Sequence, residues 1–258
     1  MSSKLGSAGV TGTDFVAKAK NDGYTILLSS SAPIIYHQVF HPADVPYNPF
    51  KDLTPLGLTT VTPMIVTIRS DAPYKNFKEM MDYAHKNPGK IRVGTAGVGS
   101  TGDFDVQLIK ALTGMDVTAV PLAGGGPAIA ALLDGHVEAV LVSFGALTDH
   151  LRSGKMKGVL ISTKVSEFPD IPTLKQLGYQ QDLLGNWYAF YGPAGLPAQV
   201  KETLSLAIEK VAKDPALSAK VAQTGLIQQF EPPEKLLARM REESRMIEEM
   251  AKKSGLIK

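Results

Sequence analysis

The sequence predicts an α/β fold, and three observations support this. From Tyr24 onward, short apolar runs alternate with amphipathic segments, an order typical of βαβ units and a largely parallel sheet. Most of the runs are rich in β-branched or aromatic residues and are bounded by glycine or proline. With 258 residues, of which 44% are hydrophobic and 20% charged, the chain is long enough for one large or two smaller globular domains.

The apolar runs are predicted as strands because they are too short for buried helices and end at turn residues. In chain order they are residues 25–29, 64–68, 91–95, 117–121, 139–143, 159–163, 187–191 and 226–230. No apolar run approaches the roughly 20 residues that cross a bilayer, so no membrane insertion is expected.

The segments between these strands carry helix signals. Asn76, followed three residues later by Glu79, forms a capping pair and opens a helix that should end near Asn87. Proline at the start and glycine at the end mark a short helix over residues 128–134. Further helices are expected from Pro197 and from residue 234. Residues 36–55 hold four prolines and fit neither period, so they are predicted as loop with at most one helical turn.

Charge and composition exclude several classes of protein. The 27 basic and 25 acidic residues leave a formal charge of +2, too little for binding to a nucleic acid backbone. The absence of cysteine removes thiol nucleophiles, thiolate metal sites and disulfides. The first 12 residues contain one lysine and no apolar core of the kind a secretory signal needs. As it stands, the chain is therefore expected to remain in the cytoplasm.

The most informative segment is a glycine-rich turn between a predicted strand and a predicted helix, residues 94–102. Its small residues let an anion approach the main chain, and the helix N-terminus supplies partial positive charge. An ordinary glycine-rich turn between strand and helix is an equally open interpretation. The residues expected to face a ligand here are Thr95, Ala96, Gly97, Ser100 and Thr101.

The same turn spells the dinucleotide fingerprint G-x-G-x-x-G at Gly97, Gly99 and Gly102. That fingerprint needs an acidic residue at the end of the next strand, about 20 residues on, to hold the ribose hydroxyls. Asp116 has the right spacing but precedes the strand over residues 117–121. A nucleotide-using α/β enzyme therefore stays open only as an alternative.

Two further turns have related chemistry. Residues 121–127 place three glycines between a strand and a helix, and residues 29–32 end a strand on clustered hydroxyls. In open α/β sheets, ligands bind beyond the carboxyl ends of the strands, where all three turns should lie. The alternative is that each turn is only a short, glycine-rich connection between secondary-structure elements and binds no ligand. The residues expected to face a ligand in these turns are Ser30, Ser31, Ala32, Gly124 and Gly125.

No constellation typical of an enzyme is found. Val98 stands where a nucleophile elbow centred on Ser100 would need glycine. His37 and His41 have the spacing of metal ligands on a helix, but they lie in a proline-rich segment. We therefore expect no catalytic residues, no metal and no cofactor.

Several short segments, in their order and spacing, resemble the substrate-binding proteins of tripartite tricarboxylate transporters, the Bordetella uptake gene family. They are Lys4-Leu5-Gly6-Ser7-Ala8-Gly9, Asp22-Gly23-Tyr24-Thr25, Tyr47-Asn48-Pro49-Phe50-Lys51-Asp52, Asn87-Pro88-Gly89-Lys90, the turn from Gly94, Val120-Pro121, Phe168-Pro169-Asp170-Ile171-Pro172-Thr173, Gly192-Pro193-Ala194-Gly195-Leu196-Pro197 and Gly255-Leu256-Ile257-Lys258.

The resemblance implies a two-lobed, type II periplasmic binding protein fold with hinge strands at residues 64–69 and 187–191. Lobe one would comprise residues 1–68 and 191–258, and lobe two residues 69–190. It implies a periplasmic solute receptor that holds a mono-, di- or tricarboxylate in an interlobe cleft and passes it to membrane components of the transporter. On this basis Ser143 and Trp187 join the expected ligand-binding residues.

The chain departs from the family pattern at three places. Leu122 and Ala123 follow the Val-Pro pair, and Ser143 and Phe144 replace an Asp-Asn-like pair, so the pocket is expected to be less polar. The family also begins with an export signal and a strand-loop-helix unit of roughly 30 residues that is expected to be missing here. A truncated receptor with impaired binding is therefore a further alternative.

Overall fold

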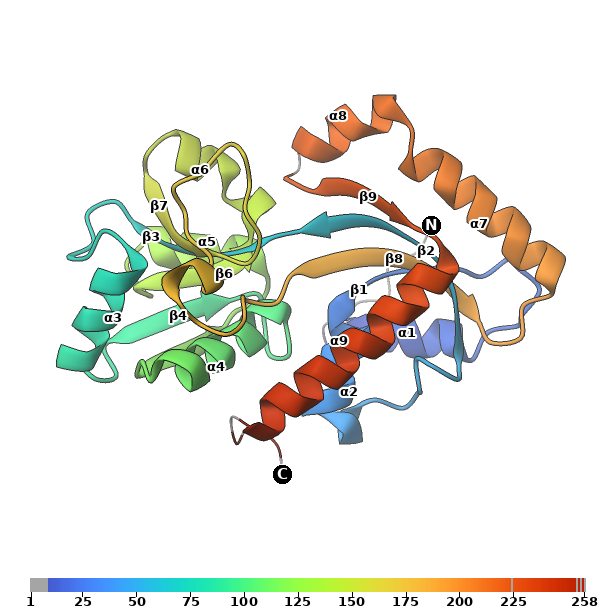
Figure 1. Cartoon of the computed structure of the whole chain (residues 1–258), viewed down its shortest axis with the longest axis horizontal. Helices are drawn as coiled ribbons and strands as arrows, with labels where there is room; N and C mark the ends of the chain where they lie inside the picture. Colours follow the sequence, from blue (N-terminus) through green and yellow to red (C-terminus); the bar gives the residue numbers. More distant parts are fainter. Residues whose placement is uncertain (1–8, 224, 254, 256, 258) are drawn as a thin grey trace. The chain divides into compact units, whose positions relative to one another are not determined.

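The computed structural model describes residues 9–223, 225–253, 255 and 257, and it has the predicted α/β class (Figure 1). The chain divides into two compact units. Unit 1 runs to Val61 and resumes at Asn186, and unit 2 is Thr62–Gly185. The boundaries expected from the resemblance, after residues 68 and 190, stay a prediction. The resembling segments at residues 4–9 and 255–258 lie partly outside the described residues.

Unit 1 is built on a four-stranded sheet with the order β1-β8-β2-β9. The strands are β1 (Leu27–Ser30), β8 (Asn186–Pro193), β2 (Leu53–Thr62) and β9 (Ile227–Glu231). The pairs β1–β8 and β2–β9 are antiparallel. Its helices are α1 (Val10–Ala17), α2 (His37–Phe40), α7 (Ala198–Ala212), α8 (Pro215–Gln223) and α9 (Pro233–Lys253), with the short turns η2 (Ala32–Tyr36) and η3 (Pro42–Asp44).

Unit 2 is built on a five-stranded sheet with the order β5-β4-β6-β3-β7. The strands are β3 (Met64–Arg69), β4 (Ile91–Thr95), β5 (Val117–Pro121), β6 (Ala139–Ser143) and β7 (Met156–Ile161). Its helices are α3 (Phe77–Lys86), α4 (Thr101–Thr113), α5 (Gly125–Leu133) and α6 (Thr148–Arg152), with the turns η4 (Phe144–Ala146) and η5 (Lys175–Leu177). Helix α3 has the predicted cap, in which Asn76 Oδ1 accepts from the N–H of Glu79 at 2.9 Å.

The expectation of a largely parallel sheet is wrong for most of the described pairings. Only β4 runs parallel to its neighbours, β5 and β6. Strand β3 is antiparallel to both β6 and β7. The chain enters β3 directly from β2 of unit 1, so no helical crossover within unit 2 fixes its direction. The parallel part is nevertheless the part that carries the two predicted glycine turns.

Strand β2 was not expected from the sequence, and neither were α1 and α8. Pro55 and Gly57 lie inside β2, and both residue types argue against a central strand. Gly57 has φ of 153°, and a Cβ added there would lie 3.1 Å from the ring of Phe230 in β9. The glycine therefore allows close approach of two strands, which a propensity scale scores only as a strand breaker.

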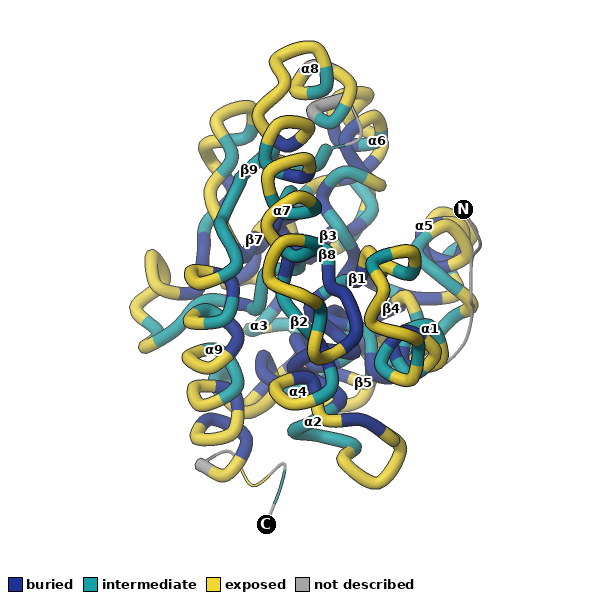
Figure 2. Tube along the Cα trace, turned by 90° about the vertical axis from the view of Figure 1, so that its right-hand side faces the viewer, coloured by how far each residue is buried: buried dark blue, intermediate teal, exposed yellow. Residues whose placement is uncertain are grey.

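The core of unit 2 includes β3, an interior strand of the sheet. Residues Met64–Ile68 are all buried, as expected for a strand with a neighbour on each side and both faces covered. Figure 2 shows buried stretches along the strands and exposed outer turns on α7 and α9. In unit 1, residues 31–37 form a continuous buried segment that begins where β1 ends.

Helix α4 lies unusually close to β6, and Gly102 makes this possible. A Cβ added at Gly102 would lie 2.1 Å from the carbonyl oxygen of Leu141. Backbone atoms cannot move aside as a flexible side chain can. The third glycine of the G-x-G-x-x-G pattern is thus required for packing of the helix against the strand.

We predict that Gly102→Ala lowers the free energy of unfolding by about 1–3 kcal/mol or more, because the methyl group must push α4 away from β6. Urea denaturation followed by circular dichroism measures this loss. Gly126→Ala is the matched control, since its Cβ would meet no atom within 4 Å and its φ is not positive. Equal stability of the two variants would show that α4 can shift without cost.

Candidate functional site

The two predicted glycine turns of unit 2 come together at one edge of its sheet. Strands β4 and β5 are parallel, with Thr95 opposite Pro121, so both turns leave the same edge. The N–H of Leu122 donates to the carbonyl oxygen of Thr95 at 3.1 Å. A Cβ added at Gly97 would lie 3.4 Å from the carbonyl oxygen of Leu122. We call residues 96–102, residues 122–126 and Ser143 the donor cluster.

Ser143 ends β6, the third parallel strand, and therefore belongs to the same edge. Its side chain is half-buried, and among the described residues its hydroxyl donates only to the sulfur of Met64, at 3.9 Å. A thioether is a weak acceptor, so this hydroxyl can turn to a better acceptor at little cost. Ser143 is thus a hydroxyl donor available to a ligand.

The side chains of Ser100 and Asp103 cap the start of α4. Ser100 Oγ accepts from the N–H of Asp103 at 3.3 Å, and Asp103 Oδ2 accepts from the N–H of Gly99 at 3.0 Å. The Gly99 N–H is therefore occupied by the protein's own carboxylate. The N–H groups of the first helical turn, at Thr101 and Gly102, have no intrahelical acceptor, and the hydroxyl proton of Ser100 remains able to donate.

The electrostatics of the donor cluster come from the backbone. None of its residues is Lys or Arg, and the nearest charge in sequence is that of Asp103. Positive potential is supplied by the N-terminus of α4, a helix of 13 residues. Such a surface can satisfy one carboxylate with several N–H and O–H donors, but it holds no cation to neutralise additional negative charge.

The remaining predicted residues of unit 2 differ in accessibility. Ala96 is exposed, and Gly97, Gly124 and Gly125 are half-buried with their backbone at the surface. Thr95 is fully buried, and its Oγ1 has no hydrogen-bond partner among the described residues. Thr101 is also buried. A ligand contact by the Thr95 hydroxyl therefore receives no support.

In unit 1, the predicted residues Ser30, Ser31 and Ala32 lie where β1 passes into η2. Ser31 is buried, and its Oγ donates to Asn186 Oδ1 at 2.9 Å. Asn186 Nδ2 in turn donates to the hydroxyl of Tyr188 at 3.3 Å, and Tyr188 lies opposite Ser30 in the β1–β8 register. We call Ser31, Asn186 and Tyr188 the polar chain of unit 1.

Asn186 and Tyr188 were missed in the sequence, although a signal existed. Alternate residues of a strand share a face, so Asn186 and Tyr188 point to one side of β8. Burial raises the pKa of the Tyr188 hydroxyl above its usual value, which keeps it a neutral donor. The signal was a pair of polar side chains two residues apart in a strand rich in aromatic residues, which places both on one face.

Trp187 points to the opposite face of β8. Its side chain is 2% exposed, and its indole N–H donates to Glu243 Oε2 of α9 at 2.8 Å. Burial raises the pKa of Glu243 above its usual value, and Arg239 donates to the same carboxyl group at 3.1 Å. The ring is thus fixed toward α9, so the predicted contact of Trp187 with a ligand receives no support from the structure.

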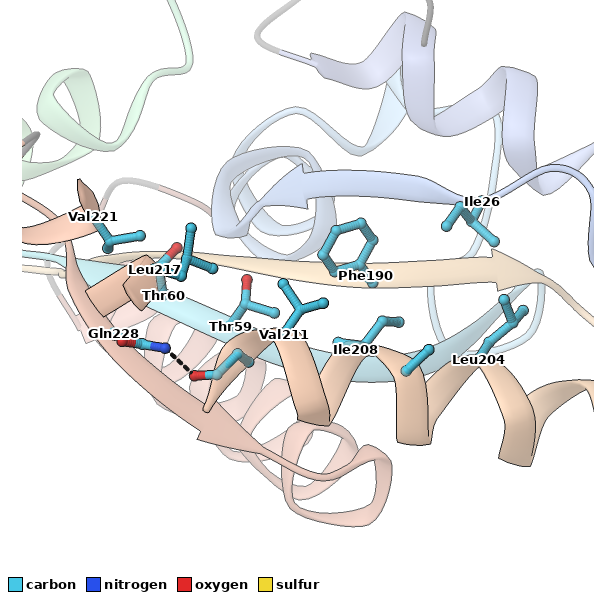
Figure 3. Close-up of a pocket in the computed structure, with 12 residues that line it drawn as sticks. Ile26, Thr59, Thr60, Phe190, Leu204, Ile208, Val211, Leu217, Val221 and Gln228 are labelled. Carbon is cyan, nitrogen blue, oxygen red and sulfur yellow. Dashed lines mark hydrogen bonds between the residues drawn. The ribbon is translucent and has the colours of Figure 1, made fainter. Parts of the chain in front are cut away.

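A cavity in unit 1 does not suit a carboxylate. It measures about 380 Å³ and lies between the sheet and the helices α7 and α8 (Figure 3). Its lining is mostly apolar and includes the side chains of Ile26, Phe190 and Leu204. The amide of Gln228 at one end is already engaged, since its Nε2 donates to the carbonyl oxygens of Ala212 and Asp214. An anion there would lose its water without gaining donors.

The alternative of a nucleotide enzyme meets a geometric obstacle. Asp116, the residue with the right spacing for ribose binding, precedes β5 and lies near Gly89, which precedes β4. Both residues are therefore at the amino-terminal edge of the sheet, opposite the glycine turn. Within the described residues, no group of three His, Asp or Glu side chains is placed to hold a metal ion.

Comparisons with known proteins give one consistent result. The model of the family described as tripartite tricarboxylate transporter family receptor matches residues 1–258. The chain belongs to this receptor family. An Agrobacterium vitis protein, the UPF0065 protein in the TAR-I ttuE-ttuC' intergenic region, is 30% identical over 224 residues, which are 86% of this chain and 64% of that protein. The chain thus spans about two thirds of the length of this relative.

Solved structures support the same receptor family. The periplasmic binding protein BugD is 30% identical with a TM-score of 0.83, and the match covers 97% of this chain and 85% of BugD. MatC from Rhodopseudomonas palustris, solved with bound malate, is 26% identical with a TM-score of 0.83, covering 95% of this chain and 85% of MatC. These similarities confirm the predicted two-lobed, periplasmic binding protein-like fold. They place the receptor chain among solute-binding proteins at the level of the family.

No described helix is both long and apolar enough to cross a bilayer.

Tyr191, on the same face of β8 as Trp187, is fully buried, and its hydroxyl has no hydrogen-bond partner among the described residues. Burial raises the pKa of Tyr191 well above its usual value.

We predict that Tyr191→Phe raises the free energy of unfolding by about 1 kcal/mol, because it removes a buried hydroxyl that has lost its hydration. Above pH ~10 an unfolded tyrosine ionises while folded Tyr191 does not, so its ionisation favours unfolding. The variant should therefore also lose stability less steeply in alkali. Urea denaturation at pH 8 and pH 10.5 measures both effects.

Tyr188→Phe is the comparison for this experiment, since the Tyr188 hydroxyl accepts a hydrogen bond from Asn186. Its removal should lower stability by about 1 kcal/mol instead. If Tyr191→Phe lowers stability as Tyr188→Phe does, the hydroxyl of Tyr191 has a hydrogen-bond partner that is not among the contacts described above.

Proposed function

We propose that this chain is a periplasmic solute receptor that captures a small carboxylate at the donor cluster and delivers it to the membrane components of a tripartite tricarboxylate transporter. One observation carries the proposal. Two glycine turns, the N-terminus of α4 and the hydroxyl of Ser143 lie at the carboxyl edge of three parallel strands. Membership of a receptor family supports the transport role.

The chemistry of the cluster favours a carboxylate over a nucleotide. N–H and hydroxyl donors match the lone pairs of a carboxylate, whereas a di- or triphosphate brings several charges that call for cations. The cluster offers no lysine or arginine. The malate bound to MatC, a relative of this chain at 26% identity, is a ligand of the proposed class.

The binding residues can be assigned roles. The N–H groups of Thr101 and Gly102 and the backbone around Gly97 and Gly124 would hold one carboxylate, with Ser143 donating a further hydrogen bond. Ser30 and the polar chain of unit 1 stay predicted contributors to the rest of the ligand. The nucleotide enzyme is the second candidate, and it is weakened by the position of Asp116 at the opposite edge of the sheet.

The first test is a thermal shift panel with malate, succinate, adipate, citrate and ATP. A ligand that binds only the folded protein adds about 2.7 kcal/mol of stability at a hundredfold excess over its Kd. We expect at least one carboxylate to raise the Tm and ATP to leave it unchanged. A rise with ATP alone would favour the nucleotide enzyme.

Ser143→Ala should then weaken binding of the active carboxylate roughly ten- to hundredfold, because a hydrogen bond to a charged group is lost. Calorimetric titration measures the change in Kd. Ser153→Ala is the matched control in the same unit, since Ser153 donates to the carbonyl oxygen of His150 at an exposed helix end. Equal affinities of the two variants would remove Ser143 from the site.

Asp103→Asn should act in the opposite direction. It removes the negative charge beside the cluster but keeps an oxygen that can accept from Gly99, so carboxylate affinity should rise by about 1 kcal/mol, or roughly fivefold. The gain should be larger for a dicarboxylate and should shrink at high salt. Asp116→Asn, the same change at the opposite edge, is the control. Unchanged affinity would mean that Asp103 does not face the ligand.

A further inference from the structure

The chain passes between its two units twice, and the two passages are held differently. The first passage leads from β2 into β3 and is fixed by hydrogen bonds on both sides. The N–H of Phe144 donates to the carbonyl oxygen of Pro63 at 2.9 Å, and the N–H of Met64 donates to Ser162 Oγ at 3.0 Å. The second passage leads from unit 2 into β8 through Leu183, Leu184 and Gly185.

A buried carboxyl group binds this second passage. Asp105 is fully buried on α4, and its Oδ1 accepts from the N–H of Leu184 at 2.7 Å. Its Oδ2 has no hydrogen-bond partner among the described residues. Burial raises the pKa of Asp105 well above its usual value, and the hydrogen bond from Leu184 only partly opposes this. Burying a carboxyl group is costly, so an apolar residue would suit helix packing better.

The position of Asp105 connects it to the donor cluster. Asp105 follows Thr101 by four residues, so the two side chains lie on one face of α4, one turn apart. Gly102, between them, fixes this helix against β6. In the sequence after Leu184, Gly185 is followed by Asn186, the middle member of the polar chain.

We propose that Asp105 is a positioning residue that anchors the second passage, the end of unit 2 that leads into Asn186, to the ligand-binding helix α4. The inference rests in part on the proposed function, because α4 is the helix whose N-terminus holds the carboxylate. It predicts that the acceptor oxygen, rather than the charge, is what the protein needs at this position.

The experiment compares Asp105→Ala, which removes the acceptor, with Asp105→Asn, which keeps it. Leu108→Ala, a fully buried site on the same helix, is the control for loss of core packing. The first readout needs no ligand and is hydrogen exchange of the peptide that covers residues 183–186. We expect Asp105→Ala to speed exchange there roughly tenfold, and both Asp105→Asn and Leu108→Ala to leave it near the wild-type rate.

The second readout is the affinity for malate, or for the panel carboxylate with the largest shift in Tm, measured at equal distance below each variant's Tm. Asp105→Ala should weaken binding roughly tenfold, and Asp105→Asn should restore it. Wild-type exchange in Asp105→Ala, or loosened exchange with unchanged affinity, would overturn the proposal. A wild-type protein that binds no carboxylate would count against the proposed function alone, and the exchange experiment would still decide the anchoring.

Discussion

The close contact between α4 and β6 is the constraint on which the rest of unit 2 depends. Because Gly102 has no side chain, the helix axis can approach the backbone of Leu141 to a distance that any other residue would prevent. This contact fixes the position of the helix N-terminus beside the turn after β5, and it directs Asp105 toward Leu184. Binding donors and the anchor of the second passage are thus set by one packing distance, so a change in it would alter both together.

Local signals in the sequence predicted the features that short-range geometry determines. The cap at Asn76, the glycine turns and five-residue strands such as β4 and β5 follow from residue type and spacing within a few positions. The α/β class and the family follow from many such segments in order. Within the donor cluster, the residues expected from the sequence do lie at one sheet edge, because parallel strands bring their carboxyl ends together.

What the sequence could not provide depends on contacts between distant segments. Strand β2 carries a proline and a glycine, and only its packing against β9 explains them. The partnership of Ser31 with Asn186 spans 155 positions, and that of Trp187 with Glu243 spans 56. Asp103 was also not foreseen as an acceptor for Gly99, although its spacing from Ser100 is that of a capping box. Strand alternation could have assigned Asn186 and Trp187 to opposite faces, but it could not have said which face meets a ligand.

The burial of Trp187 against α9 has a consequence for spectroscopy. The chain contains one tryptophan, and it lies in unit 1. Tryptophan fluorescence therefore reports only on unit 1, whereas unit 2, which contains the donor cluster and Asp105, emits no tryptophan signal. An unfolding curve recorded by fluorescence alone would show one transition whether or not the two units unfold together. A second probe, such as circular dichroism, is needed to distinguish one cooperative protein from two independent halves.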